Sequence, residues 1–265
     1  MRNIKMKLFA GVMAVSVLSC GMMVQAAETE GARPNIICHK MDSISIDGDL
    51  SDWNLDSPAV VKDPTQVIRD VVFWQGENDC SMTVYAGYDA ENLYLAFDVT
   101  EDTIYGAIEM LPIDGEDNLK VYVSTDPTAD PERQAYGTND FLVYLIMDEG
   151  YWDTAIDRSM IEKEARQRFV SKGTDGGENV IDGYQVGTVP TTTGFIFECA
   201  IPWATFSNKN IPVYEPQSGD TLSVDFAITD ISYPCPGTEY IPQMAWAGTL
   251  DINTNPSQWG SMTLE

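Results

Sequence analysis

The sequence has little histidine and few basic residues. Among 265 residues there is one histidine, His39, and 15 Lys and Arg face 41 Asp and Glu, a formal net charge of −26. A Ser-His-Asp triad or a zinc site built from several histidines is therefore not expected. The negative charge also argues against nucleic acid as a partner, because binding to phosphates needs clustered Lys and Arg, and it disfavours docking on anionic lipid.

Long apolar runs are scarce as well. Residues 1–26 carry three early basic residues, an apolar run and a small-residue ending at Ala26, which is typical of a secretory signal peptide. No other stretch approaches the roughly 20 apolar residues that a membrane helix needs. We therefore expect export from a bacterial cell, no membrane span, and a secreted or cell-surface location. Leu18-Ser19-Cys20 resembles a loose lipobox, so a lipid anchor on Cys20 stays open.

Cleavage after Ala26 leaves a strongly acidic chain with an even number of cysteines. Residues 27–265 hold 12 basic and 41 acidic residues, and acids supply the oxygen ligands that calcium prefers outside the cell. Four cysteines permit two disulfides in three connectivities, but a core of this size does not require them, so free thiols are equally compatible with the sequence. The four are Cys38, Cys80, Cys199 and Cys235.

Alternating apolar and polar residues recur along residues 27–265, separated by turns rich in Asp, Gly and Pro. This period of two, with no sustained helical period, predicts an all-β fold, an antiparallel β-sandwich of the jelly-roll or immunoglobulin-like kind. The turn Asp89–Asn92 between two alternating runs predicts a hairpin. We find no linker or repeat and expect one domain over 27–265. The alternating segments are 43–46, 81–88, 93–99, 119–123, 195–201 and 222–228, and residues 141–147 predict a more uniformly apolar strand.

One segment departs from this pattern. Residues 156–172 are rich in Glu, Arg and Lys and predict a short helical insertion, followed by an exposed glycine-rich loop. The insertion carries five of the 12 basic residues of the processed chain. It is interpreted as a solvated insertion, and the alternative is a basic patch that binds an acidic sugar or the acidic body of its own domain.

Several short pieces, taken in order, resemble one family. Together they are similar to the family 9 carbohydrate-binding modules of the DOMON-like β-sandwich group, and they extend over nearly all of residues 27–265. The resemblance implies a non-catalytic protein that binds a polysaccharide or oligosaccharide and assists polysaccharide breakdown. The pieces are Ile46–Trp53, Tyr85–Leu95 with Asp98, Asp117–Val123, Glu198–Trp203, Gly219–Asp220 with 225–230, Trp246 and Pro256–Gly260.

The resemblance also suggests where a sugar would bind. Family members hold a terminal sugar between two tryptophans, and an aromatic plane suits the apolar face of a pyranose. The matching positions here are Asp114 and Asn253, which the resemblance makes candidate sugar contacts although neither is aromatic. An apolar residue near Val143 replaces the family's arginine. Other aromatic residues are then the candidates for contacting the sugar. These candidates are Trp152, Tyr151, Trp74 and Tyr105.

The remaining tryptophans and acidic turns receive structural interpretations. Trp53, Trp203 and Trp259 stand at strand ends or turns, where an indole caps a core with its N–H bonded. Asp47, Asp49 and Asp52 crowd one turn, which suits a structural calcium ion of the kind that the resemblance implies. Aspartate also favours turns for its own backbone hydrogen bonds, so both interpretations stay open.

Two other function classes are considered. The DOMON-like group includes haem-binding domains, and His39 and Met41 are close in sequence, but residues two apart on one strand point the same way and do not bracket a haem plane. No haem is therefore expected. A glycoside hydrolase would need two suitably spaced carboxylates, which 41 acids supply by chance, and no other catalytic motif is present.

Overall fold

The structure is a computed structural model that describes residues 33–103, 117–146, 183–207, 210–231 and 241–265. These residues lie in one unit, Arg33–Glu265, and its regular structure is almost entirely strand, which confirms the all-β prediction. The strands are β1 (Asn35–Lys40), β2 (Ala59–Val61), β3 (Val67–Arg69), β4 (Cys80–Tyr88), β5 (Asn92–Glu101), β6 (Asn118–Ser124), β7 (Asp140–Ile146), β8 (Gln185–Pro190), β9 (Gly194–Pro202), β10 (Thr221–Thr229), β11 (Gln243–Ala245) and β12 (Gly260–Leu264). Short 3₁₀ helices are η1 (Leu50–Asp52), η2 (Pro64–Gln66), η7 (Trp203–Phe206) and η8 (Pro256–Gln258).

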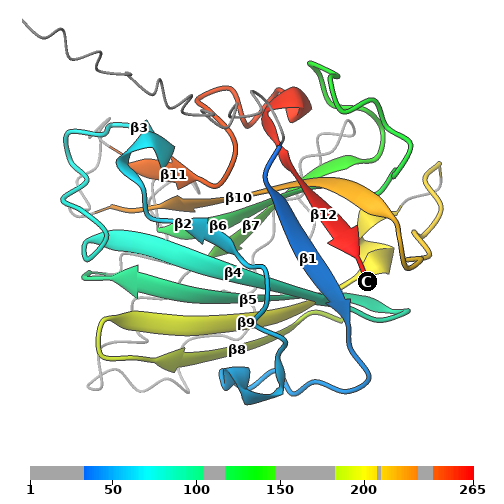
Figure 1. Cartoon of the computed structure of the whole chain (residues 1–265), viewed down its shortest axis with the longest axis horizontal. Helices are drawn as coiled ribbons and strands as arrows, with labels where there is room; N and C mark the ends of the chain where they lie inside the picture. Colours follow the sequence, from blue (N-terminus) through cyan, green and yellow to red (C-terminus); the bar gives the residue numbers. More distant parts are fainter. Residues whose placement is uncertain (1–32, 104–116, 147–182, 208–209, 232–240) are drawn as a thin grey trace, which may run out of the picture. The chain divides into compact units, whose positions relative to one another are not determined.

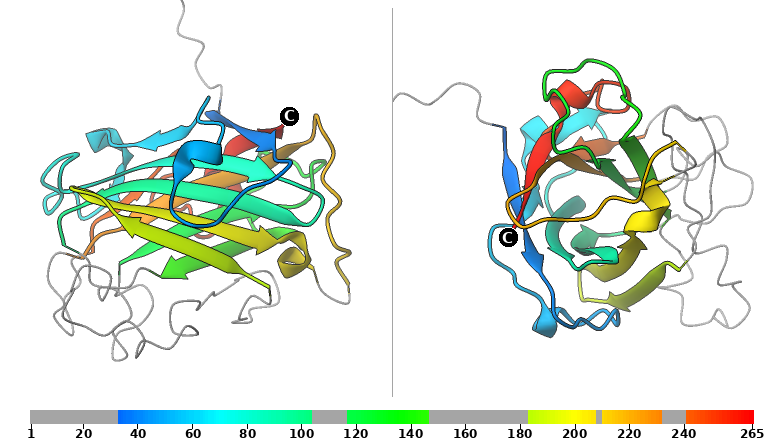
Figure 2. Two further views of the ribbon diagram at one scale, coloured as in Figure 1. Left: turned by 90° about the horizontal axis from the view of Figure 1, so that it is seen from below. Right: turned by 90° about the vertical axis from the view of Figure 1, so that its right-hand side faces the viewer.

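The strands form two layers that are joined along one side (Figure 1). One layer has the order β8-β9-β5-β4, and β2 and β1 pair with successive parts of the free edge of β4. The other has the order β7-β6-β10, and β12 and β11 pair with successive parts of β10. β1 runs parallel to both β4 and β12 and so joins the layers, while the other pairs are antiparallel. Figure 2 shows β1 and β12 together on one flank of the unit.

The β4–β5 hairpin forms where the alternation of residues predicted it. Strand β4 places alternate apolar side chains in the core, and β5 does the same from the opposite arm. At the turn, the Asp89 carboxylate accepts hydrogen bonds from the backbone N–H of Glu91 (2.8 Å) and Asn92 (2.7 Å) and from the Tyr94 hydroxyl (2.7 Å). One aspartate side chain therefore fixes the turn, as short polar side chains commonly do.

The core lies between the two layers, and aromatic side chains connect them. Phe97 of β5 packs edge-on against Phe197 of its neighbour β9 and against Phe226 of β10 in the other layer, with ring centroids 6.1 and 6.2 Å apart. These edge-to-face contacts are the favoured geometry for aromatic pairs. Because β4, β5 and β9 face β6 and β10, burial of their inward side chains holds the sandwich together.

The three tryptophans predicted to be structural are all buried. Trp203 and Trp259 are fully buried, and their indole N–H groups donate to the backbone oxygens of Asp89 (3.1 Å) and Ile252 (3.0 Å). Trp53 is 8% exposed and donates to the Glu198 carboxylate (2.7 Å). The prediction that these rings cap the core with a bonded N–H is confirmed.

Two further predictions from the sequence concern a strand at residues 43–46 and the pairing of the cysteines. Residues 43–46 form no strand, and the alternation there is misleading because Ile44 and Ile46 pack as loop residues beside Trp53 and Tyr94. Cys38, Cys80 and Cys199 are buried free thiols.

In the part of the chain that the structure describes, no helix is long and apolar enough to cross a membrane. Residues 1–26 with Cys20, the insertion at 156–172, and Cys235 lie outside the described residues.

A buried aspartate stands at the point where β10 changes partner from β12 to β11. Asp225 has no exposed surface, and its Oδ1 accepts hydrogen bonds from the backbone N–H of Phe226 (2.7 Å) and Ala247 (3.1 Å). Burial raises its pKa to about 7, although the backbone donors lower it. The folded state therefore keeps a proton on Asp225 at pH values where the unfolded chain has lost it.

This difference predicts a pH-dependent stability. Between about pH 4 and pH 7 the folded chain binds the extra proton at Asp225, so its contribution to the free energy of unfolding falls as pH rises through that window and is constant above it. Asp225→Asn should remove that part of the slope. Urea unfolding at pH 5 and pH 8 should show a smaller difference for Asp225→Asn than for the parent, whereas Asp56→Asn, which removes an exposed carboxylate, should show the parent's difference.

Candidate functional site

Four of the residues predicted to bind sugar lie outside the described residues: Tyr105, Asp114, Tyr151 and Trp152. The strands that flank them do meet. β5 ends at Glu101, β6 begins at Asn118, and β7 ends at Ile146, which pairs with Asn118. The four residues are therefore a few positions from strand ends that gather at one end of the sandwich. Loops at a common end of a sandwich are where binding residues often occur.

The structure places the other two predicted sugar contacts in structural surroundings. Trp74 is half-buried against the core, and its indole N–H donates to the Cys80 backbone oxygen (2.9 Å). Asn253 is exposed, but its side-chain oxygen accepts a hydrogen bond from the Tyr122 hydroxyl (2.7 Å). Their role in sugar binding stays a prediction.

The predicted calcium ligands lie close together in the sequence, but each accepts a hydrogen bond from a different backbone N–H. Asp47 accepts from the backbone N–H of Asp49 (3.0 Å), Asp49 accepts from Ser51 (2.9 Å), and Asp52 accepts from Ser45 (2.8 Å). Their carboxylate oxygens do not gather within 4.8 Å of one another. Each aspartate therefore supports the backbone of its own turn, and calcium binding here stays a prediction.

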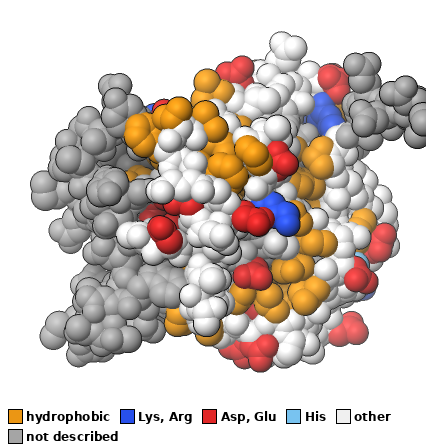
Figure 3. Space-filling model, turned by 60° about the vertical axis from the view of Figure 1, so that its left-hand side comes forward, with side chains coloured by type: hydrophobic (Ala, Val, Ile, Leu, Met, Phe, Trp, Pro, Cys, Tyr) orange, Lys and Arg blue, Asp and Glu red, His pale blue; other side chains and the backbone are white. Residues whose placement is uncertain are grey.

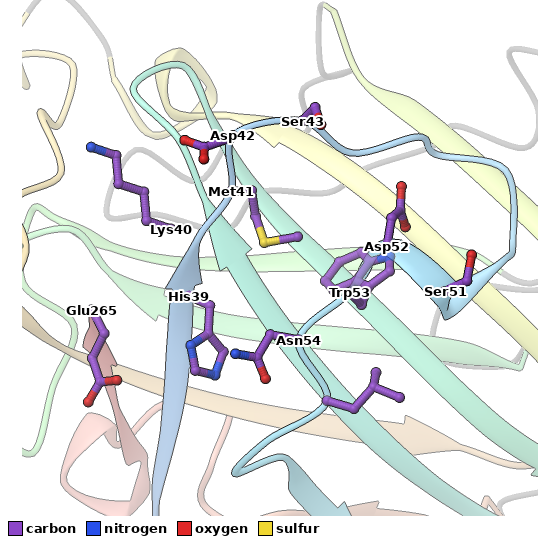
Figure 4. Close-up of a pocket in the computed structure, with 11 residues that line it drawn as sticks. His39, Lys40, Met41, Asp42, Ser43, Ser51, Asp52, Trp53, Asn54 and Glu265 are labelled. Carbon is purple, nitrogen blue, oxygen red and sulfur yellow. The ribbon is translucent and has the colours of Figure 1, made fainter.

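An open hollow of about 790 Å³ lies beside this loop (Figure 4). Carboxylates from Asp42, Asp52 and Glu265 stand around it, together with polar groups that could bind hydroxyls. Trp53 contributes to the wall, but its ring is 8% exposed and offers little flat surface. His39 and Met41, considered above as haem ligands, line this same hollow.

A buried carboxylate holds the loop at the edge of the hollow. Glu198 of β9 has no exposed surface, and its Oε2 accepts hydrogen bonds from the backbone N–H of Asp47 (2.8 Å) and Gly48 (2.7 Å). Its Oε1 accepts from the Trp53 indole. Gly48 adopts φ +86°, and a Cβ there would lie 2.3 Å from the Val189 side chain, so this position requires glycine. Burial raises the pKa of Glu198, while these three donors lower it.

A second buried acidic group lies at the end of the sandwich where β5 ends and β6 begins. Cys80, Glu101 and Asp230 are almost fully buried, and a potential ligand atom from each lies within 4.8 Å of the others. Burial, followed by the charges of Asp230 and Asp117, raises the pKa of Glu101 well above its usual range. Burial, and then the charges of Asp79 and Asp102, raises the pKa of Asp230 to about 7.

This cluster of Cys80, Glu101 and Asp230 was not predicted from the sequence. Its members come from three segments that are separated by 21 and 129 positions, so no spacing motif links them. The available signal was weaker: Glu101-Asp102 and Asp230 each follow the last apolar residues of a strand. Acidic side chains are common and basic ones few on the face shown in Figure 3, as the composition requires. Acids at strand ends are therefore not a specific signal for a site in this sequence.

Comparison with known proteins agrees with this architecture. The family model "Carbohydrate family 9 binding domain-like" matches residues 46–265, which is most of the chain. The chain therefore belongs to the family 9 carbohydrate-binding domains. This is a family of binding modules, which fits a protein without catalytic activity. A search among curated proteins gave no match.

Solved structures share the fold at low sequence identity. A family 9 carbohydrate binding module from Caldicellulosiruptor kristjanssonii in complex with cellotriose is similar over 87% of this chain and 93% of its own, with a TM-score of 0.57 and 14% identity. A structure of a family 9 module from the same organism in complex with glucose has a TM-score of 0.53 at 13% identity, and covers 87% of this chain and 95% of its own. A putative carbohydrate-binding protein from Bacteroides uniformis ATCC 8492 has a TM-score of 0.53 at 10% identity, over 88% of this chain and all of its own.

The Glu198 contacts predict a measurable loss of stability. Glu198→Gln places an amide N–H₂ where three donors converge, so at least one buried donor loses its acceptor, at a cost of about 1–3 kcal/mol in the free energy of unfolding. Trp53→Phe keeps a ring but removes one donor, and should cost less. Urea unfolding measures both. Asp98→Asn, on the exposed face of β5, is the control, and a loss in Glu198→Gln no larger than in Asp98→Asn would contradict the assigned role.

Proposed function

We propose that this chain is an exported, non-catalytic protein that binds a polysaccharide or oligosaccharide and assists polysaccharide breakdown. The observation that carries the proposal is the match of the family model over residues 46–265, together with a fold shared with modules solved in complex with cellotriose and glucose. The signal-like residues 1–26 support export. Glucose-based oligosaccharides are therefore the first ligands to test.

Aromatic residues that follow β5 and β7 within a few positions in the sequence are the best candidates for the binding surface. A sugar needs a flat ring for its apolar face and polar groups for its hydroxyls. The hollow beside Trp53 has polar groups, but its one tryptophan is buried, which makes it a poorer platform. We therefore assign sugar stacking to Trp152, with Tyr151 and Tyr105 as further candidates.

Glycan binding by the purified chain tests both the function and the site. Affinity gel electrophoresis with cellulose-derived and xylan-derived polysaccharides, followed by titration calorimetry with cello-oligosaccharides, should show binding by the parent. Trp152→Ala should lose about 1–2 kcal/mol of binding free energy, roughly a five- to thirtyfold weaker Kd, because an aromatic platform is removed. Asn54→Ala, in the hollow, should bind like the parent.

Three other results of the binding experiment would each contradict one part of the proposal. No binding to any glycan at millimolar concentration would contradict the proposed function. Binding that Asn54→Ala weakens and Trp152→Ala leaves unchanged would contradict the assigned site and move it to the hollow. Release of reducing ends during incubation would contradict the non-catalytic assignment. Repeating the titration with a calcium chelator tests the calcium predicted at Asp47, Asp49 and Asp52, since loss of the ion should loosen that loop.

A further inference from the structure

Three side chains that commonly bind metals meet where the two layers face each other at one end of the sandwich. Cys80 is the first residue of β4, Glu101 is the last residue of β5, and the two pair across the strands. Asp230 follows the last residue of β10 in the other layer. The Cys80 sulfur and one carboxylate oxygen from each acid lie within 4.8 Å of one another. Ligands of one tetrahedral ion are about 3–4 Å apart, so little movement is needed to enclose an ion.

The two carboxylates have binding capacity that the protein does not use. Glu101 is 4% exposed and Asp230 is 2% exposed, yet Glu101 Oε2 and Asp230 Oδ2 have no hydrogen-bond partner. The great majority of buried polar atoms in proteins are bonded, and a buried oxygen without a donor costs free energy. Both acids belong to the group that meets Cys80. Buried carboxylates with an unbonded oxygen, gathered beside a thiol, are what a cation site provides.

The surroundings of the three side chains are strongly negative. Asp117 is fully buried and lies close enough for its charge to act on both Glu101 and Cys80. Asp79 and Asp102 act in the same way on Asp230, and Asp102 is exposed at the rim. In the described chain, Arg33, Lys62, Arg69 and Arg133 form their ion pairs with other acids. The local field therefore favours a cation at the three side chains.

We propose that Cys80, Glu101 and Asp230 bind a zinc ion. Calcium and magnesium take oxygen ligands, whereas a thiolate combined with carboxylates suits zinc, which binds sulfur at about 2.3 Å and oxygen at about 2.0–2.2 Å. A water or a further carboxylate oxygen would complete four-coordination. On binding, the Cys80 thiol and any protonated carboxyl group release their protons to solvent, and the thiolate and carboxylates become the ligands.

Such an ion would link the two layers. Cys80 and Glu101 belong to the layer of β4 and β5, and Asp230 belongs to the layer of β10, so one ion would connect the layers at this end. The site is separate from the Asp47–Asp52 loop and from the hollow beside Trp53. Its test is also independent of glycan binding, because the readouts are the metal's own spectrum and the stability of the chain.

Cobalt is a spectroscopic probe for this site, since a thiolate bound to Co²⁺ gives a near-ultraviolet charge-transfer band. The full purified chain is reduced, treated with a chelator and dialysed, and one equivalent of Co²⁺ is added. We expect the band in the parent, its loss when one equivalent of Zn²⁺ displaces the cobalt, and a rise in Tm with Zn²⁺. Cys80→Ser should abolish the band and weaken Zn²⁺ binding at least about tenfold.

Matched variants separate this site from the other cysteines. Cys199→Ala removes a buried cysteine on β9 and should keep the cobalt band. Asp230→Asn should keep the band but weaken Co²⁺ binding at least about tenfold, which also provides the test if Cys80→Ser does not fold. The proposal is wrong if the parent shows no charge-transfer band. It is also wrong if the band persists in folded Cys80→Ser, or if Ca²⁺ raises Tm equally in the parent and in Cys80→Ser while Zn²⁺ does not.

Discussion

The parallel pairing of β1 with β12 is the constraint on which the rest of the structure depends. Residues 35–38 pair with residues 261–264, and the end of β1 then continues along β4. One strand near the start of the described chain thereby takes an edge from each layer. Without it, the edges of β4 and β12 that it pairs with would both be exposed over several residues, and exposed strand edges invite pairing with other chains. With it, the inward faces of the layers stay opposed and the core between them can be buried.

The closed sandwich buries two groups of acidic side chains, and the hydrogen bonds that these groups receive differ. Glu198 receives three donors, so its charge is matched by hydrogen bonds and it fixes the loop that contains Gly48. Glu101 and Asp230 receive fewer donors than they have oxygens, and each lies near further acids. The first arrangement is that of a structural anchor. The second is costly to keep without a proton or a cation.

The sequence predicted the parts of the fold that depend on local patterns. The β4–β5 hairpin followed from alternation and from Asp89, and the buried state of Trp203 and Trp259 followed from large rings at strand ends. β1 and β12 were not predicted, because their runs are short and each depends on a partner more than 200 positions away. The Cys80 cluster was missed because its members are 21 and 129 positions apart, so no local pattern links them. Conversely, alternation at 43–46 predicted a strand that does not form, since those side chains pack in a loop.

The direction of β1 and β12 also decides how the two ends of this unit are presented. Because the two strands are parallel, Pro34, which precedes β1, and Glu265, which follows β12, lie at opposite ends of the pair. Glu265 lies beside Lys40, about 20 Å from Pro34 at roughly 3.3 Å per residue. The end of β4 that holds Cys80 lies toward Pro34, and the Asp89 turn lies toward Glu265. A tag ahead of Arg33 would therefore immobilise the chain with the Asp89 turn facing solvent. A tag after Glu265 would instead leave the end of β5, the start of β6 and the end of β7 accessible to a soluble probe.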